Sequence, residues 1–226
     1  MRKTTIDRLR APESGARLDL RIFEAEGDDV VEGCLIDADD QQWFRIENGV
    51  ADLLPSSLRR HDRHRAFADR HGLEIGNAIC VEASAPHKHQ LEFFGRYHQE
   101  YERDVVESPF YRVLDGVTLG RWISRSLAPG CVVAELGAGS GRQTLPLLKH
   151  GVEVIGLDLS EEMLVLARQK ALDAKNRGRA DFVVASAEQL PLAEESVDAA
   201  LIYGSLHHFA DPEASLREAS KVMREG

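Results

Sequence analysis

The residues best suited to chemistry in this sequence are a carboxylate, three closely spaced glycines and a second carboxylate further on. An apolar run from Val132 reaches Glu135 and continues as Leu-Gly-Ala-Gly-Ser-Gly, with glycines at 137, 139 and 141. A second apolar run, Val152–Leu157, is followed by Asp158. Glycine has no Cβ atom, so the backbone can turn sharply and approach a ligand closely. A carboxylate after the next strand can accept hydrogen bonds from ribose hydroxyls. The pattern therefore indicates a site for a ligand that contains adenosine.

The spacing of the glycines argues against a dinucleotide. The dinucleotide-binding fingerprint is Gly-x-Gly-x-x-Gly, and counted from Gly137 its third glycine falls on Arg142. A pyrophosphate site is therefore disfavoured, and a nicotinamide-dependent oxidoreductase is the weaker alternative.

Several motifs in order resemble one family. Glu135–Gly141 is similar to motif I of the class I S-adenosylmethionine-dependent methyltransferases, and Gly156–Ser160 is similar to the segment that follows it. Further segments that resemble the family are Ala185–Pro191, Ser196–Asp198, Leu206–Pro212 and Leu216–Val222. The resemblance spans roughly residues 121–226 and is greatest to small-molecule methyltransferases of the ubiquinone and menaquinone type. It implies S-adenosylmethionine as the cofactor and a small-molecule methyl acceptor.

The resemblance also implies roles for individual residues. Glu135 would orient the loop and the methionine amino end, the glycine loop would flank the methionine moiety, and Asp158 would hold the ribose. Ser186 stands where relatives typically have aspartate beside the adenine, and Glu188 can substitute for that carboxylate. The expected cofactor-binding residues are Glu135, Gly137, Ala138, Gly139, Gly141, Asp158, Leu159, Ser186, Ala187, Glu188 and Tyr203.

Two histidines are candidates for a catalytic base. His207 and His208 follow the fourth expected strand, at the edge of the predicted crevice, and histidine titrates near neutral pH. Methyl transfer depends mainly on alignment of the reacting groups, so a base is needed only if the acceptor must lose a proton. A structural role at the entry to the next helix is the alternative.

The elements that must position these residues alternate along the second half of the chain. Near-continuous apolar runs indicate parallel strands buried on both faces, at Cys131–Leu136, Val152–Asp158, Phe182–Ala185 and Ala199–Tyr203. Helical patterns cover Arg142–His150 and Ser160–Asn176, and Asp211 with Pro212 begins a last helix. This right-handed βαβ series predicts an α/β, Rossmann-like fold.

The expected sheet is shorter than that of the family. The resemblance implies seven strands in the order 3-2-1-4-5-7-6, and this sequence accounts for strands 3-2-1-4 before it ends at Gly226. We therefore expect a C-terminally truncated sheet with Ala199–Tyr203 as an open edge, which can pair with a second copy. A catalytically inactive S-adenosylmethionine-binding pseudoenzyme, or a partner subunit, is the alternative to an active enzyme.

The first 56 residues differ from the rest in their pattern of apolar and polar residues. Alternation in Leu18–Phe23 and in part of Val30–Ile36 indicates short strands, and Asn48-Gly49 indicates a turn. Residues 33–55 weakly resemble a small Trm112-like domain. Asp37 and Asp40 replace a cysteine pair found in metal-binding members, so we expect no zinc here.

Residues 57–120 are expected to form a helical linker or lid before the cofactor-binding part at 121–226. Helical patterns cover Ser57–His71 and Lys88–Glu107, between Pro86 and Pro109. The second carries an aromatic stripe, which suits core packing or a ligand contact and consists of Phe93, Phe94, Tyr97 and Tyr101. The basic cluster Arg59–Arg65 suits a solvated helix, with an anion-binding patch as the alternative.

Composition limits the remaining possibilities. A net charge of −10 argues against nucleic acid as a partner. No apolar run is long enough to span a bilayer, so no membrane is expected. The three cysteines, Cys34, Cys80 and Cys131, are far apart and form no disulfide or metal pattern, which favours the cytoplasm.

Overall fold

The computed structural model describes residues 1–37, 39, 42–74, 102–174 and 177–225. The aromatic stripe Phe93, Phe94, Tyr97 and Tyr101 lies outside these residues, as do Asp40 and Cys80.

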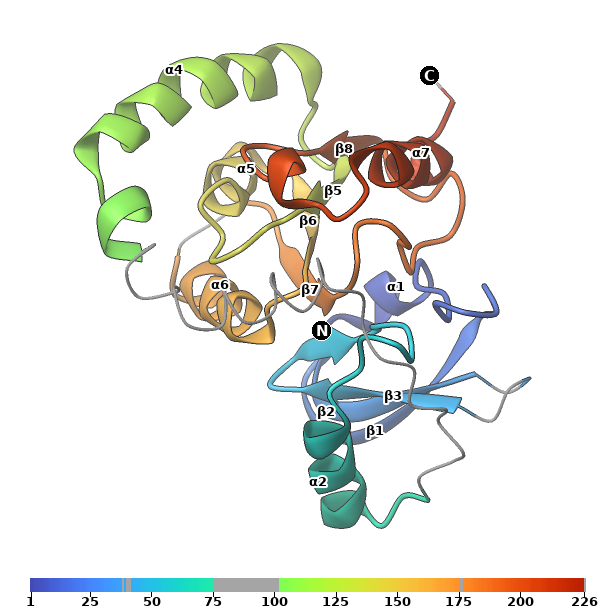
Figure 1. The fold of residues 1–226 in the computed structure, drawn as a ribbon. Helices are drawn as coiled ribbons and strands as arrows, with labels where there is room; N and C mark the ends of the chain where they lie inside the picture. Colours follow the sequence, from blue (N-terminus) through green and yellow to red (C-terminus); the bar gives the residue numbers. More distant parts are fainter. Residues whose placement is uncertain (38, 40–41, 75–101, 175–176, 226) are drawn as a thin grey trace.

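Four parallel strands form one half of the sheet (Figure 1). They lie in the order β7-β6-β5-β8 and comprise β5 (Val132–Leu136), β6 (Glu153–Asp158), β7 (Ala180–Val184) and β8 (Ala199–Leu201). Every residue of β5 is buried, as expected for a strand covered on both faces. The order confirms the predicted 3-2-1-4 arrangement. It also places the switch of strand order beside β5, where ligands bind in α/β sheets.

The N-terminal strands extend the same sheet. An antiparallel meander is formed by β1 (Leu18–Glu26), β2 (Asp29–Asp37), β3 (Gln42–Glu47) and β4 (Val50–Asp52). The turn between β3 and β4 is the predicted Asn48-Gly49, with φ angles of 52° and 69°, which this type of turn requires. β4 then pairs in parallel with β7, so that the complete order is β1-β2-β3-β4-β7-β6-β5-β8.

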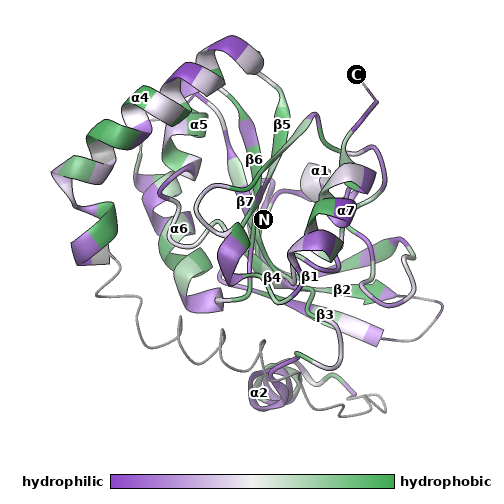
Figure 2. Cartoon of the chain, turned by 45° about the horizontal axis from the view of Figure 1, so that its top comes forward, coloured by the Kyte–Doolittle hydropathy of each residue, from purple (hydrophilic) through white to green (hydrophobic). Residues whose placement is uncertain are grey.

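Helices cover both faces of the sheet (Figure 2). One face is covered by α4 (Pro109–Ser126), α5 (Thr144–His150) and α6 (Glu161–Asp173), and the other by α1 (Lys3–Ile6) and α7 (Pro212–Val222). The remaining helix, α2 (His61–His71), packs on the N-terminal strands. A π-helical turn spans Glu102–Val106, and a 3-10 turn spans Leu206–His208. Among the described helices, none has the length and apolar character needed to cross a bilayer.

The starts of two helices follow the predicted capping residues. Ser160 accepts a hydrogen bond from the backbone N–H of Met163 (3.4 Å), and Asp211 accepts one from Ala214 (2.9 Å). Pro109, which bounds the helical pattern Lys88–Glu107, is also the first residue of α4. Proline suits a first helical position, where the missing N–H would have no partner within the helix.

The outer edge of β8 is partly occupied. A parallel bridge joins Val197, which precedes β8, to Met223, which follows α7. The backbone N–H of Arg224 donates to the carbonyl of Val197 at 2.9 Å. Within the described residues, β8 itself has β5 as its one strand partner.

Candidate functional site

The glycine loop after β5 has the backbone conformation that its sequence predicts. Gly137, Gly139 and Gly141 have φ angles of 76°, 51° and 82°, in the left-handed region that other residues rarely adopt. A Cβ atom on Gly137 would lie 2.5 Å from the Cβ of Ser205, and one on Gly141 would lie 3.2 Å from the Cβ of Ala167. The loop therefore depends on glycine for its conformation and for its close packing.

The carboxylate of Asp158 connects this loop to α6. Its Oδ2 accepts a hydrogen bond from the backbone N–H of Gly139 (2.9 Å), and its Oδ1 accepts one from Ser160 (2.8 Å). Burial raises the pKa of Asp158, while these backbone donors lower it in part. Asp158 lines the cavity at the carboxyl ends of the strands, so its oxygens are held beside the space that a ribose would need.

Glu135 lies at the base of the same loop and is 2% exposed. Its Oε2 accepts a hydrogen bond from the hydroxyl of Thr144 at 2.6 Å. Burial raises the pKa of Glu135 to about 8, while the bond from Thr144 opposes that shift. A pKa of about 8 favours the neutral carboxyl group at pH 7 in the free protein, and a nearby cation would favour its ionised form.

The segment after β7 forms another wall of the cavity. Ala187 and Glu188 line it, whereas Ser186 is buried beside them. Glu188 accepts hydrogen bonds from the hydroxyl of Ser186 and from the backbone N–H groups of Ala210 (2.7 Å) and Asp211 (3.3 Å). Glu188 thus holds the segment after β7 against the loop that precedes α7.

The cavity brings together most of the residues expected from the sequence. The expected residues that line it are Gly137, Gly139, Asp158, Leu159, Ala187, Glu188, Tyr203 and His208. Those that do not line it are Glu135, Ala138, Gly141, Ser186 and His207. The proposed ligand contacts of both groups stay predictions. The residues of the second group lie next to or near lining residues in the sequence.

Several lining residues were not expected from the sequence. They are Leu136, Gln143, Leu157, Met163, Ala185, Gly204, Ser205 and Phe209. Most of them lie next to a strand end or to an expected contact residue. Their adjacency in sequence to Glu135, Asp158 and Tyr203 could therefore have predicted that they line the cavity. Ser205 is buried and its hydroxyl donates to the carbonyl of Leu136 at 2.8 Å. Its position follows from packing against Gly137, which the sequence does not show.

The two histidines differ in position. Both are exposed, their rings are 3.9 Å apart, and His208 lines the cavity. Partial loss of solvent around the ring and the neighbouring His207 lower the pKa of His208. The lowered pKa favours the neutral ring of His208, and its place in the cavity lining makes it the better placed of the two to accept a proton.

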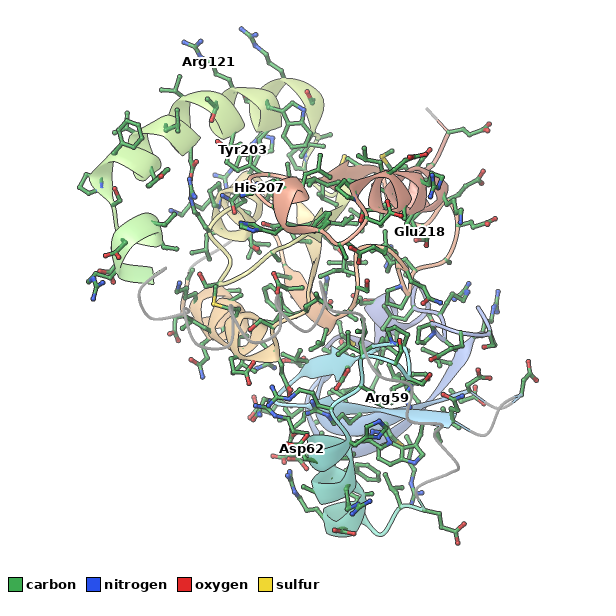
Figure 3. All side chains as sticks on the ribbon, viewed as in Figure 1. Arg59, Asp62, Arg121, Tyr203, His207 and Glu218 are labelled. Atoms are coloured by element: carbon green, nitrogen blue, oxygen red, sulfur yellow. The ribbon has the colours of Figure 1, made fainter. Side chains whose placement is uncertain are left out.

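Helix α4 is tied to the mouth of the cavity by a polar cluster. Asp115 accepts two hydrogen bonds from the guanidinium of Arg142 (2.7 and 2.8 Å) and one from the hydroxyl of Tyr203 (3.2 Å). The guanidinium of Arg142 also lies 4.8 Å from the ring centroid of Tyr111. Figure 3 shows Tyr203 beneath this helix, near His207. Arg142, which occupies the third-glycine position of the dinucleotide fingerprint, thus binds α4 through Asp115.

The end of β2 carries Asp37, one of the two aspartates that replace a cysteine pair. Asp37 accepts hydrogen bonds from the hydroxyl of Ser14 (2.5 Å) and from the N–H of Asp39 (3.1 Å). In the part of the chain that the structure describes, no group of three or more His, Cys, Asp or Glu side chains is placed to hold a metal ion. The absence of zinc stays a prediction.

Comparisons with known proteins agree with this geometry. Residues 134–226 match the family model described as "Methyltransferase domain". The chain is 36% identical over 98 residues to a demethylmenaquinone methyltransferase of Corynebacterium kroppenstedtii, a match that covers 43% of this chain and 39% of that protein. It is 37% identical over 93 residues to a ubiquinone/menaquinone biosynthesis C-methyltransferase of Syntrophotalea carbinolica, covering 41% and 38%.

Among solved structures, a complex of the Haloferax volcanii Trm112 methyltransferase activator with a methyltransferase is similar at a TM-score of 0.49. That match is 25% identical and covers 59% of this chain and 56% of that chain. The chain spans less than half the length of the two curated relatives named above. In its motifs, strand order and family match, the part of this chain at residues 134–226 is similar to the class I S-adenosylmethionine-dependent methyltransferases.

Proposed function

We propose that this protein transfers a methyl group from S-adenosylmethionine to a small-molecule acceptor. The observation that supports this most directly is Asp158, whose half-buried carboxylate lines the cavity between the glycine loop and α6. The donor set fits the cofactor, with a carboxylate for the ribose hydroxyls and apolar Leu159, Met163 and Ala187 for the adenine. The cofactor supplies a methyl group already activated on a sulfonium. The protein then has to align the reacting groups and exclude water.

The acceptor belongs to the same proposal. The two relatives are named for demethylmenaquinone and for ubiquinone/menaquinone biosynthesis, which supports a quinone-like small molecule. If the acceptor must lose a proton, His208 at the cavity is the base we propose, in preference to His207.

Further expectations from the sequence are kept as proposals. Residues 1–56 would act as a docked strand-rich segment, 57–120 as a helical lid and 121–226 as the cofactor-binding part. Self-association would proceed through the outer edge of β8, because its three residues pair with β5 alone among the described strands. The net charge of −10 disfavours nucleic acid as a partner. The unpaired Cys34 and Cys131 suit the reducing cytoplasm.

Calorimetric titration with S-adenosylmethionine, S-adenosylhomocysteine and NAD tests the proposal. We expect both sulfur ligands to bind and NAD not to bind. At 100 times its dissociation constant, such a ligand should stabilise the fold by about 2.7 kcal/mol. Transfer of a labelled methyl group to a demethylated quinone then tests catalysis. A folded protein that shows no thermal shift with millimolar S-adenosylhomocysteine would contradict the proposal. Binding without transfer to any acceptor would leave the pseudoenzyme.

A further inference from the structure

A buried arginine joins the N-terminal strands to the helix that follows Asp158. Arg45 lies on β3 and is 1% exposed. Its two terminal nitrogens donate to the two carboxylate oxygens of Glu161, at 2.7 and 2.6 Å. They also donate to Glu47 (2.7 Å) and Asp52 (3.0 Å). One guanidinium therefore connects β3, the end of β4 and the start of α6.

Both ends of this connection are adjacent to the cofactor cavity. Glu161 is the first residue of α6 and follows Ser160, whose backbone N–H holds Asp158. Asp52 lies opposite Val184 of β7, and Val184 lies opposite Asp158 of β6. The contacts of Arg45 therefore fix the distance between β4 and the backbone N–H of Ser160, which orients the carboxylate of Asp158.

The chemistry of the connection suits positioning more than stability. A buried ion pair adds little net stability over well-packed apolar side chains, whereas a two-point arginine–carboxylate contact is strongly directional. Burial alone would raise the pKa of Glu161, but the hydrogen bonds and charges of Arg45 and Arg63 outweigh burial and lower it. Glu161 is thus held ionised and aimed at β3.

The basic cluster seen in the sequence belongs to the same network. Arg63 of α2 donates to Glu161 and Glu162 (2.5 Å each), and Arg60 donates to Glu162 at 2.9 Å. The guanidinium of Arg59 lies 4.7 Å from the ring centroid of Phe44; Figure 3 shows Arg59 near the start of α2. Arg60 and Arg63 thus support the start of α6 through ion pairs with Glu161 and Glu162.

We propose that Arg45 is a positioning residue for the cofactor, which acts through Glu161 and Ser160 to hold the carboxylate of Asp158 toward the ribose hydroxyls. This inference rests on the proposed function and extends it to the N-terminal strands. These strands are then part of the binding machinery, although none of their residues lines the cavity.

Arg45→Lys tests the proposal, because lysine keeps the charge but cannot contact both oxygens of Glu161. The probes are S-adenosylhomocysteine and its 2′,3′-dideoxy analogue, measured by calorimetry on the full chain. We expect wild type to prefer the natural ligand by at least about 100-fold, from two charge-assisted hydrogen bonds. Arg45→Lys should lose about tenfold in affinity for the natural ligand and less than about twofold for the analogue, as one such bond weakens. The matched control is Arg70→Lys. Like Arg45, Arg70 forms ion pairs between two elements, but its pairs join α2 to Glu32 and Glu47 of the N-terminal strands.

The outcomes separate the possibilities. An unchanged affinity of Arg45→Lys for S-adenosylhomocysteine would overturn the inference, and so would an equal loss for both ligands, which indicates general loosening. If Arg45→Lys does not fold, Glu161→Gln is measured in the same way, with the same expected and contrary results. Failure of folded wild type to bind would overturn the proposed function and this inference together. Binding by wild type with an unchanged variant would overturn the inference alone.

Discussion

Replacement of Glu135 by glutamine should make the free protein more stable while weakening its hold on the cofactor. The carboxyl group is 2% exposed, and burial raises its pKa from 4.5 to about 8. The folded protein thus keeps a proton that the unfolded chain releases above pH 4.5. This group favours folding most below pH 4.5, and its contribution is lost as the pH rises to about 8. Glutamine cannot ionise in the unfolded chain and still accepts the bond from Thr144. We therefore expect Glu135→Gln to gain about 3 kcal/mol at pH 7, more at pH 8 and less than about 1 kcal/mol at pH 5.

Urea denaturation followed by circular dichroism at pH 5, 7 and 8 measures this gain. Exposed Glu194→Gln is the control, and its free energy of unfolding should stay within about 0.5 kcal/mol of wild type. Calorimetry at pH 7 should show weaker binding of S-adenosylhomocysteine by Glu135→Gln, because an amide offers no charge to an ammonium group. A variant that is less stable than wild type at pH 8, or a gain equal at pH 5 and pH 8, would refute the reasoning.

Two further substitutions test the walls of the cavity. Asp158→Ala should weaken S-adenosylhomocysteine binding more than Glu188→Ala, since Asp158 is proposed to meet two hydroxyls with bonds of about 1.5–3 kcal/mol each. Equal calorimetric affinities of wild type and Asp158→Ala would place the ribose elsewhere. Gly137→Ala should lower the melting temperature more than Gly130→Ala. Both glycines have positive φ, but a Cβ on Gly137 meets Ser205 whereas one on Gly130 meets nothing within 4 Å. Similar melting temperatures for the two variants would show that the loop gives way at little cost.

The central strands and their ligand-facing ends were predictable because their signals are local. Apolar runs followed by Glu135 and Asp158 marked two strands, and the capping residues Ser160 and Asp211 marked helix starts. Strand order followed from the handedness of βαβ connections and from the family resemblance. The boundaries shifted by a few residues, as for β8, which ends at Leu201 instead of Tyr203.

The rest depended on contacts between distant segments. No local pattern shows that β4 pairs with β7, because the two strands are far apart in the sequence. The contact of Arg45 with Glu161, which joins the same two parts of the chain, is likewise distant in sequence. Helix α4, which begins at Pro109, had no clear local signal in the sequence beyond that proline. The contact of Ser205 with Gly137 likewise arises only when the loop after β8 folds back over β5.

The parallel pairing of β4 with β7 has a consequence for synthesis on the ribosome. The meander that ends in β4 emerges early, but the strand that completes its edge emerges only with Ala180–Val184. Throughout that interval the backbone groups on this edge of β4 lack the strand that pairs with them in the folded protein. Contacts between residues so far apart in the sequence slow folding and prolong the lifetime of aggregation-prone intermediates. The nascent N-terminal strands therefore expose an unpaired sheet edge until β7 has been synthesised.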